Sequence, residues 1–283
     1  MLMELRDVSY TYSPDTSYAK TAVSHVSLSI EAGEFIAVIG HTGSGKSTLI
    51  QLLNALLIPT EGQVFYHGRD IMEEGFDRRA MRTRIGLVFQ YPENQLFEED
   101  VVKDVAFGPK NQGCTPEEAE KRAKEALRAV GVEEKYDAQS PFELSGGQKR
   151  RVAIAGVLAM DPEILILDEP TAGLDPMGRD AILREAKRLQ KERNITVILV
   201  SHSMEDVAAY AERVLVMADG ALLMDGTARQ VFHERKILED TGLTVPEAAA
   251  LMQELREAGF PEGDDVITVE EARDEILRVF GKL

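Results

Sequence analysis

The chain has 283 residues, of which 44% are hydrophobic and 29% charged, a composition that argues against wholesale disorder and fits one large domain or two small ones. Its formal net charge of −17 disfavours binding to nucleic acid or anionic lipid by bulk charge. A single cysteine, Cys114, excludes an internal disulfide framework, and no run of apolar residues approaches the length of a membrane span.

The first apolar run, Phe35–Ile39, predicts a buried strand that leads directly into a glycine-rich loop. The loop fits the P-loop pattern and precedes a helical run that starts at Thr48; it reads Gly40-His41-Thr42-Gly43-Ser44-Gly45-Lys46-Ser47. Glycines let backbone N–H groups converge on phosphate oxygens at the positive end of the new helix. We expect Lys46 to reach the β- and γ-phosphates of a nucleotide and Ser47 to ligate Mg²⁺. A glycine-rich turn without a ligand is the minor alternative.

The next two runs predict strands of different kinds. Residues 64–66 predict an antiparallel strand, whereas residues 85–89 predict a buried strand of a parallel sheet covered on both faces. Gln90 follows the second of these, and its amide oxygen could reach Mg²⁺ or an attacking water. From position alone, an ordinary loop glutamine is an equally good interpretation.

Residues 91–150 show helical patterns in place of short apolar runs and predict a helical insertion in the α/β core. Thr115-Pro116-Glu117-Glu118 predicts a capping box with proline at the first helical position, opening a helix that ends near Gly131. Further on stands the motif Leu144-Ser145-Gly146-Gly147-Gln148, here called the LSGGQ motif, followed by Lys149-Arg150-Arg151. A hydroxyl and two glycine N–H groups at a helix start predict a second anion site. A plain helix cap does not account for this motif together with the P-loop.

A further buried strand, residues 164–167, ends in Asp168-Glu169. Carboxylates at the carboxyl end of a parallel strand face the ligand crevice. Asp168 suits the Mg²⁺ shell, through a water, and Glu169 could orient or deprotonate the attacking water. Without a P-loop, a surface Asp-Glu pair that closes a strand would be the better interpretation.

The strand predicted over residues 196–200 is followed by His202. A lone histidine after a strand is usually structural. Here we expect the strand to be a parallel neighbour of the P-loop strand, which would let His202 contact a γ-phosphate. Ser203 predicts the N-cap of the next helix, with Asp206 at its third position.

The end of the chain predicts one hairpin and a helical tail. Residues 214–217 and 221–224 predict an antiparallel pair joined by a turn at Asp219-Gly220. Residues 231–283 contain two further predicted capping boxes, each followed by apolar residues at helical spacing: Thr244 with Glu247, and Thr268 with Glu271.

The order of these motifs resembles that of the nucleotide-binding subunits of ATP-binding cassette (ABC) transporters, over about residues 3–227. The resemblance implies ATP as the nucleotide, with Tyr12 stacked on adenine and Tyr10 as the alternative. It implies that Thr48 completes the phosphate-binding set of residues 40–47. It also implies that Ser47, Gln90 and Asp168 bind Mg²⁺. The implied catalytic residues are Glu169, as the base, together with His202 and Gln90.

The resemblance also implies a dimer. ATP held by a partner subunit would be contacted by four residues of the LSGGQ motif: Ser145, Gly146, Gly147 and Gln148. Asp175 corresponds to the D-loop of the family. The implied fold is an α/β P-loop NTPase of ABC type with an antiparallel β subdomain, a helical subdomain and a small helical appendage. Its expected division is a core of residues 1–90 and 151–230, a helical subdomain of residues 91–150, and a dimerising appendage of residues 231–283.

A narrower resemblance concerns the energy-coupling factor (ECF) transporters. Residues 88–97, VFQYPENQLF, resemble the Q-loop region of their ATPases, and His41-Thr42 with residues 169–175, EPTAGLD, resemble the second of their two ATPase paralogues. The resemblance implies four things: a heterodimer with a paralogous ATPase, a membrane scaffold protein, a substrate-binding membrane protein, and a peripheral location at the cytoplasmic face of the cell membrane. The transported micronutrient would be a vitamin or a metal ion.

The apolar cluster Tyr91, Leu96 and Phe97 lies next to Gln90 in the sequence. We expect it to line or support a groove for cytoplasmic helices of the scaffold, because an ATPase without a membrane segment must act on its membrane partner by contact. For Leu96 alone, core packing is the better interpretation.

Three alternatives remain at this stage. The nearest is a homodimeric ATPase of a nickel or cobalt uptake transporter. An ABC ATPase acting on nucleic acid or the ribosome is disfavoured by the charge of −17 and the lack of a long coiled-coil insertion, so we expect no nucleic acid partner. A small-molecule kinase would have no use for the LSGGQ motif.

Overall fold

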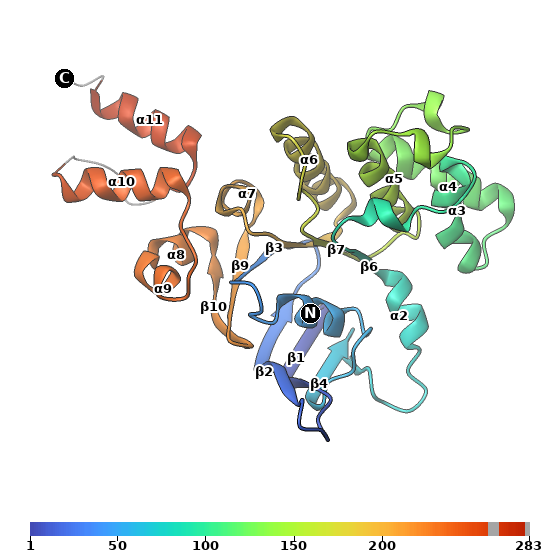
Figure 1. Ribbon diagram of the computed structural model, residues 1–283, viewed down its shortest axis with the longest axis horizontal. Helices are drawn as coiled ribbons and strands as arrows, with labels where there is room; N and C mark the ends of the chain where they lie inside the picture. Colours follow the sequence, from blue (N-terminus) through green and yellow to red (C-terminus); the bar gives the residue numbers. More distant parts are fainter. Residues whose placement is uncertain (260–265, 281–283) are drawn as a thin grey trace.

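Two β-sheets form the frame of the computed structural model, which describes residues 1–259 and 266–280 (Figure 1). One sheet has six strands in the order β10-β9-β3-β8-β7-β6, and the other has four in the order β2-β1-β4-β5. In the described part of the chain, no helix is both long and apolar enough to cross a membrane.

The six-stranded sheet is parallel except at one edge. Its strands are β3 (Phe35–Ile39), β6 (Ile85–Val88), β7 (Ile164–Asp168), β8 (Thr196–Val200), β9 (Arg213–Ala218) and β10 (Ala221–Thr227). β3 pairs in parallel with β8 and β9, and β7 pairs in parallel with β6 and β8, as the apolar runs predicted. β10 pairs antiparallel with β9 through a turn in which both Asp219 (φ 49°) and Gly220 (φ 83°) are left-handed, which confirms the predicted hairpin.

The inner strands β3, β7 and β8 are almost wholly apolar because both of their faces are covered. In β7, Ile164 and Ile166 pack into one hydrophobic cluster, while Leu165 and Leu167 pack into another on the opposite face. The first cluster also contains helix α1 (Lys46–Leu53), and the second contains helix α6 (Pro176–Arg193). With both faces covered, the carboxyl ends of the strands are left to form a site.

The four-stranded sheet is antiparallel, as residues 64–66 predicted. It consists of β1 (Met3–Tyr12), β2 (Lys20–Ile30), β4 (Glu61–Tyr66) and β5 (Arg69–Asp70). Its inner face shares a hydrophobic cluster with α1, in which Leu5, Val26 and Val64 accompany Leu49. The short helix α2 (Arg78–Arg84) then leads back to β6.

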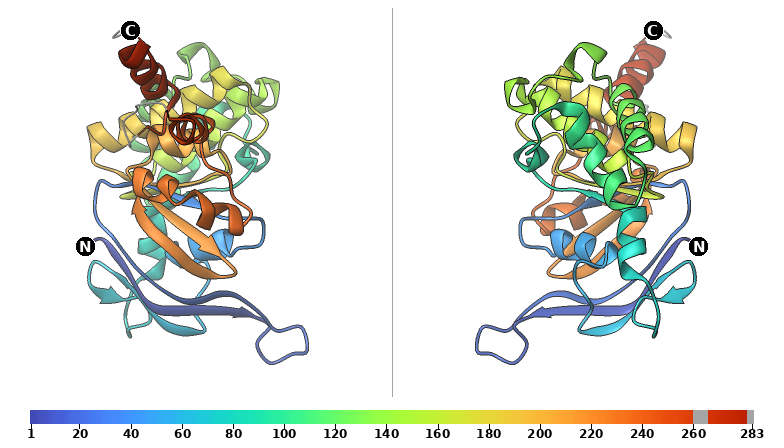
Figure 2. Two further views of the ribbon diagram at one scale, coloured as in Figure 1. Left: turned by 90° about the vertical axis from the view of Figure 1, so that its left-hand side faces the viewer. Right: turned by 90° about the vertical axis from the view of Figure 1, so that its right-hand side faces the viewer.

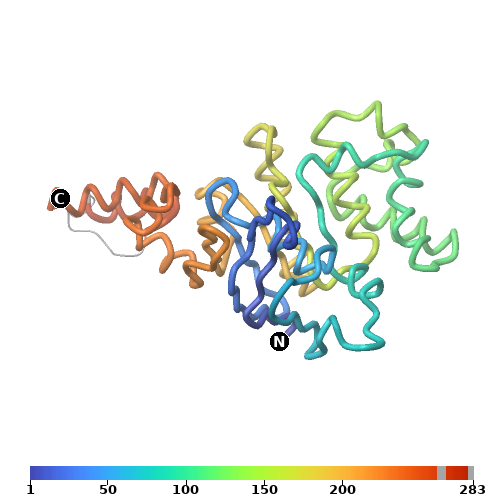
Figure 3. Tube along the Cα trace, turned by 60° about the horizontal axis from the view of Figure 1, so that its bottom comes forward, coloured from blue at the N-terminus to red at the C-terminus, as the bar shows by residue number. Residues whose placement is uncertain are grey.

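A helical segment follows β6 and lies at the opposite end of the molecule from the C-terminal helices (Figure 3). It comprises α3 (Val101–Asn111), α4 (Pro116–Ala129) and α5 (Gly146–Leu158), with 3₁₀ turns at Pro92–Gln95, Glu134–Tyr136 and Pro141–Glu143. Thr115 caps α4, because its Oγ1 accepts a hydrogen bond from the Glu118 N–H at 3.3 Å. The Glu118 carboxylate accepts from Arg122 Nε at 2.9 Å, so the return half of the predicted capping box is not made there.

The other side of the core carries α7 (Met204–Tyr210), α8 (Ala228–His233) and α9 (Arg235–Asp240). Ser203 caps α7 as predicted, with its Oγ accepting from the Asp206 N–H at 3.2 Å. Phe232 of α8 and Leu238 of α9 pack in one hydrophobic cluster with strands β3 and β9. The first part of the predicted appendage therefore packs against the core sheet.

The last two helices, α10 (Glu247–Glu257) and α11 (Val269–Phe280), project from this core (Figures 1 and 2). They pack together through Ala248, Met252 and Ala272. The Thr268–Glu271 capping box is confirmed, since Thr268 Oγ1 accepts from the Glu271 N–H at 3.3 Å and Glu271 Oε2 accepts from the Thr268 N–H at 3.2 Å.

The other capping box predicted in the tail is wrong. Helix α10 begins at Glu247 with Pro246 as its N-cap residue and has no side-chain cap. A residue before proline is held away from helical backbone angles, so Val245 cannot be the first helical residue that a Thr244 cap requires.

Candidate active site

The loop of residues 40–47, here called the phosphate loop, joins β3 to α1 in a tight turn. A Cβ on Gly45 (φ 102°) would lie 2.3 Å from the backbone oxygen of Ala22, so only glycine fits there. At Gly43 a Cβ would meet nothing within 4 Å, so there is open space beside this residue. The β9–β10 hairpin holds the loop from behind, because the Gly220 N–H donates to the Ser44 carbonyl at 3.1 Å.

Two buried polar side chains of this loop favour an anion. Lys46 is 6% exposed, and its Nζ donates to the carbonyl oxygens of Gly40 at 2.6 Å and of His41 at 3.0 Å. Burial lowers the pKa of Lys46, against the opposing effect of the Glu169 and Asp168 carboxylates. The Ser44 hydroxyl is buried with no hydrogen-bond partner in the described structure. A phosphate oxygen would satisfy Ser44 and would offer Lys46 a stronger acceptor than a carbonyl.

A cavity of about 240 Å³ opens beside this loop. It is lined by Tyr12, Lys20, Ala22, Gly43, Gly45, Lys46, Ser47 and Thr48. The Tyr12 hydroxyl lies 3.2 Å from Thr48 Oγ1, which ties β1 to the start of α1. Tyr10 packs edge-on against Tyr12, with ring centroids 4.8 Å apart, and joins the hydrophobic cluster below. Tyr12 is thus the tyrosine that offers a ring to the cavity.

Gln90 and His202 both contact the carboxylate of Glu169, and each of these three residues follows the end of a different strand. Glu169 follows β7, and its Oε1 lies 2.8 Å from Nε2 of His202, which follows β8. Its Oε2 accepts a hydrogen bond from Nε2 of Gln90, which follows β6, at 2.9 Å. Glu169 has a left-handed backbone (φ 48°), uncommon for a residue with a side chain and a form of strain typical of functional sites.

The neighbouring carboxyl, Asp168, has a pKa raised to about 6 by burial and by the charge of Glu169, with Lys46 and His202 acting in the opposite direction. A divalent cation would relieve this repulsion. The Ser47 hydroxyl, the Asp168 carboxylate and the Gln90 amide supply the oxygen donors that Mg²⁺ prefers. Within residues 1–259 and 266–280, no group of three His, Cys, Asp or Glu side chains could hold a metal ion, so a cation here would need other ligands, such as hydroxyl, amide or phosphate oxygens.

The LSGGQ motif forms the exposed start of α5. Ser145 Oγ accepts from the Gln148 N–H at 3.4 Å, and Gln148 Oε1 accepts from the Ser145 N–H at 2.9 Å, which is a complete capping box. A Cβ on Gly146 or Gly147 would meet nothing within 4 Å, so the face of this turn is open. Asp175 caps α6 by accepting from the Gly178 N–H at 2.7 Å. The side-chain hydrogen bonds of Ser145, Gln148 and Asp175 stay local and do not reach the phosphate loop.

Two arginines that sequence analysis gave no role connect these motifs. Arg179 at the start of α6 donates to Asp206 at 2.9 Å and to Ser203 at 2.8 Å, next to His202. Arg150 of α5 is buried and binds Glu93, which lies just after Gln90. The sequence shows Arg150 only as one of three basic residues after the LSGGQ motif, because its partner is 57 residues earlier in the chain.

A mostly apolar groove of about 290 Å³ runs between α2, α3 and α5, with Arg79, Asp104 and Asn111 among its polar lining residues. Leu96 and Phe97 line it, and Phe97 stacks edge-on against Phe107 with centroids 5.0 Å apart. Leu96 is 7% exposed and belongs to the core, whereas Phe97 is 56% exposed. Tyr91 is exposed but lies outside the residues that line the groove.

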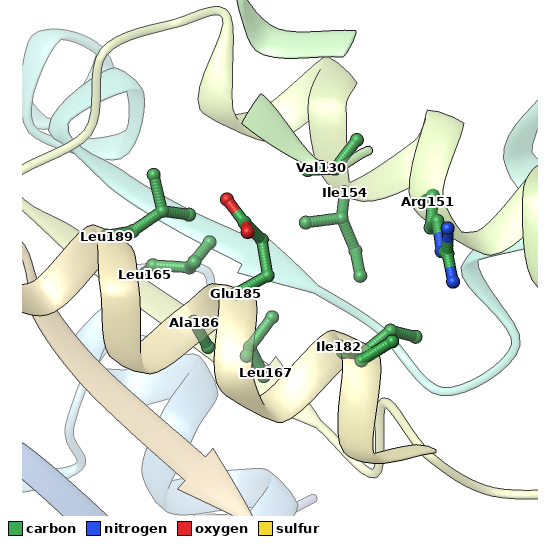
Figure 4. Close-up of a pocket in the computed structure, with 10 residues that line it drawn as sticks. Val130, Arg151, Ile154, Leu165, Leu167, Ile182, Glu185, Ala186 and Leu189 are labelled. Atoms are coloured by element: carbon green, nitrogen blue, oxygen red, sulfur yellow. The ribbon is translucent and has the colours of Figure 1, made fainter. Parts of the chain in front are cut away.

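A smaller cavity lies between α5 and α6 (Figure 4). Its volume is about 20 Å³, room for roughly one water molecule. Its lining is mostly aliphatic and includes Ile154, Leu165, Ile182 and Leu189. It is a small gap in the packing between α5 and α6 and is too small for an organic ligand.

Comparison with known proteins agrees with this geometry. The family model described as "ABC transporter" matches residues 23–172. The chain is 54% identical to the energy-coupling factor transporter ATP-binding protein EcfA2 of Clostridium acetobutylicum, over 99% of this chain and 98% of the relative. It is 51% identical to the protein of the same name from Caldanaerobacter subterraneus, over 98% of this chain and 97% of the relative.

Two solved structures are also similar. CbiO1 from Clostridium perfringens, described as part of the ABC transporter complex cbiONQ, superposes with a TM-score of 0.76 at 38% identity, covering 89% of this chain and 98% of CbiO1. The ATP-binding cassette MJ0796, a dimer in a post-hydrolysis state with ADP and phosphate, superposes with a TM-score of 0.72 at 32% identity. That match covers 81% of this chain and 99% of the cassette.

Proposed function

The chain belongs to the ABC transporter family of ATP-binding proteins, and on that premise we propose that it is the ATP-hydrolysing subunit of an energy-coupling factor transporter. Such a subunit powers membrane uptake of a micronutrient, a vitamin or a metal ion, through a scaffold and a substrate-binding component. The observation that carries the proposal is the meeting of Gln90, Glu169 and His202 beside a phosphate loop. The similarity to proteins named EcfA2 over nearly the whole chain selects the transporter type.

ATP binding follows from the cavity beside the phosphate loop. The ring of Tyr12 offers a stacking surface for adenine, which places the triphosphate along residues 40–47. Lys46 turns from two backbone carbonyls to the β- and γ-phosphates, and the Ser44 hydroxyl gains an acceptor. Thr48, held by Tyr12, fixes the first turn of α1 beneath the phosphates.

Hydrolysis uses the carboxylate edge of the sheet. Glu169 takes a proton from a water whose oxygen attacks the γ-phosphorus; the bond from that phosphorus to ADP breaks, and ADP and phosphate leave. His202 and Gln90 move from the Glu169 oxygens to the γ-phosphate and the water, which frees the base. Magnesium, held by Ser47 and Gln90 and through water by Asp168, would neutralise charge on the phosphates.

The open LSGGQ face implies a second subunit. Its glycines face open space, and its serine and glutamine hydrogen-bond only to each other, so we infer that Ser145–Gln148 and Asp175 complete the ATP site of a partner ATPase. The dimeric cassette at 32% identity supports pairing. A paralogous partner is favoured by the relatives named EcfA2, and a homodimer is the second candidate. Mass spectrometry of the purified membrane complex would count its distinct ATPases.

Contact with the membrane proteins would use the apolar groove at Phe97. Three of its lining residues, Gln95, Leu96 and Phe97, follow shortly after Gln90, which senses the nucleotide in this proposal, so closure at ATP can move the groove. We infer that cytoplasmic helices of the scaffold occupy it and hold the ATPase at the cytoplasmic face of the membrane. The helices α10 and α11 carry exposed apolar residues and would add to the ATPase dimer.

The test of the proposed function is Lys46→Ala. The variant should lose tight MgATP binding or turnover, because the charge-assisted contact to the phosphates is gone from a site built around it. Lys124→Ala, which removes an exposed lysine paired with Glu120 on α4, is the matched control and should hydrolyse ATP normally. Near-normal turnover by Lys46→Ala at saturating ATP would contradict the assignment of the phosphate loop.

A further inference from the structure

The least exposed charged side chain in the described structure is that of Arg150, at 2%. A buried guanidinium is costly unless its N–H donors are matched with acceptors. Arg150 therefore needs partners, and their identity shows what this residue does.

The guanidinium is held on two sides. Its Nε donates to Glu93 Oε2 at 3.1 Å and its Nη2 to Glu93 Oε1 at 2.8 Å, a bidentate pair. Its Nη1 donates to the carbonyl oxygens of Ala172 at 2.6 Å and of Pro170 at 3.2 Å. Four of the five N–H groups of arginine are matched in this way.

Arg150 and its partners belong to three different segments of the proposed ATP site. Arg150 itself lies two residues after the LSGGQ motif, on the first turns of α5. Glu93 lies three residues after Gln90, and Pro170 and Ala172 follow Glu169 on the way to Asp175. One rigid planar group thus links the LSGGQ helix to the residues that follow the glutamine and to the residues that follow the base.

The connection from Gln90 to Glu93 is short. Tyr91, between them, has a left-handed backbone (φ 55°), and the Arg150 guanidinium lies 5.9 Å from its ring centroid. A movement of Gln90 away from Glu169 must be absorbed by Tyr91 and Pro92 or passed to Glu93. Because two hydrogen bonds join Glu93 to Arg150, a movement of Glu93 is transmitted to α5 and to the LSGGQ motif at the start of that helix.

We propose that Arg150 and Glu93 form a positioning pair that makes the LSGGQ motif follow the position of Gln90. The inference rests on the proposed function, since it assumes that both motifs act on ATP. Arg150 does not touch the nucleotide in this account, so it acts only through the orientation of its neighbours. A purely structural pair would fix α5 on the core and would have no effect on turnover beyond its effect on stability.

The experiment compares Glu93→Gln, Arg150→Met and the double variant, each in the full chain assembled with its partner ATPase. Each single change leaves the other member of the pair, the buried Arg150 or the half-buried Glu93, without its charged partner and should lower Tm by about 10 °C. The double variant removes both charges and should regain at least about half of that loss. Its kcat should nevertheless stay at least about tenfold below wild type, with KM for ATP within about twofold, because the phosphate loop is unchanged.

Two further variants separate the explanations. Arg150→Lys keeps the charge but cannot hold a carboxylate and two carbonyls at once, so its kcat should fall while its Tm stays closer to wild type. The control pair Arg213→Met with Asp225→Asn removes another bidentate pair, at 2.7 Å, that joins β9 to β10 away from these motifs. It should change Tm without changing kcat.

The outcomes distinguish the two proposals. A double variant that regains kcat together with Tm, or an Arg150→Lys protein with normal kcat, would show that the pair is structural only and would overturn the inference. A wild-type complex that does not hydrolyse ATP would overturn the proposed function itself.

Discussion

Nε2 of His202 lies 2.8 Å from Oε1 of Glu169, across the carboxyl ends of the neighbouring strands β8 and β7. The second oxygen of the same carboxylate accepts a hydrogen bond from Gln90 at 2.9 Å. Both oxygens of the proposed base are therefore engaged by residues that also belong to the site. These two contacts fix the orientation of the Glu169 carboxylate and leave some of its acceptor positions open to a water, so hydrolysis should depend on the arrangement of Gln90 and His202.

Glu169→Gln should bind MgATP but hydrolyse it about 10²–10⁴ times more slowly, because the amide has nearly the same shape and is a poor base. A closed, ATP-bound dimer should accumulate. The measurement is single-turnover hydrolysis together with size-exclusion chromatography in ATP. Glu192→Gln, on the exposed end of α6, is the control and should behave as wild type. Unchanged turnover in Glu169→Gln would place the base at another residue, with His202 and Gln90 the next candidates.

Asp168→Asn should stabilise the protein in the absence of nucleotide and Mg²⁺ while it abolishes hydrolysis. The folded-state pKa of Asp168, about 6, lies above its ordinary value of 3.8, so the stability that comes from protonation is present at low pH and is lost as the pH rises through about 6. Removing the carboxyl should therefore raise Tm by about 3 °C at pH 8 and by less at pH 5. Equal differences at the two pH values would contradict this account of the raised pKa.

Phe97→Ser should reduce substrate uptake by the assembled transporter more than it reduces ATPase rate or Tm, since Phe97 is exposed in the proposed scaffold groove. Leu96→Ser should instead lower Tm, by about 6 °C or more, because Leu96 is a core residue. Leu223→Ser, an exposed leucine on β10, controls for the loss of surface apolar area. If uptake by Phe97→Ser falls only in step with Tm, the coupling surface lies elsewhere.

Leu251→Gln with Leu277→Gln should weaken the ATPase dimer, because both side chains are exposed on the projecting pair α10 and α11. Tm of the isolated chain should change by less than about 2 °C, as surface substitutions have small effects. The dimer dissociation constant by analytical ultracentrifugation is the measurement, and Ile237→Gln on α9 is the control. An unchanged constant would make α10 and α11 an extension of the core only.

Local sequence was sufficient for the strands of the parallel sheet, the phosphate loop and the hairpin turn. In these segments the signal and its cause lie within a few residues, as at Asp219-Gly220, where both residues accept left-handed angles. The meeting of Gln90, Glu169 and His202 was also predictable, because parallel strands end at one edge of a sheet.

Long-range contacts were not predictable in this way. The pairing of Arg150 with Glu93 spans 57 residues and depends on how α5 packs on the core. The failure at Thr244 has a local cause, since the cap pattern was present but Pro246 prevents helical angles at Val245. Phe232 lies within the predicted appendage of residues 231–283, yet it fills the cluster beside β3, which no periodicity reveals.

The position of β3 in the sheet has a consequence for synthesis of the chain. β3 lies between β8 and β9, and its loop is held by Gly220, about 180 residues after Ile39. At about 5–20 residues per second, a nascent chain carries a bare apolar strand for roughly 10–40 s before its neighbours leave the ribosome. The phosphate loop, which is synthesised early, is thus among the last parts of the chain to reach its folded surroundings. Fragments that end before β9 are expected to contain the whole phosphate loop and yet to bind no nucleotide.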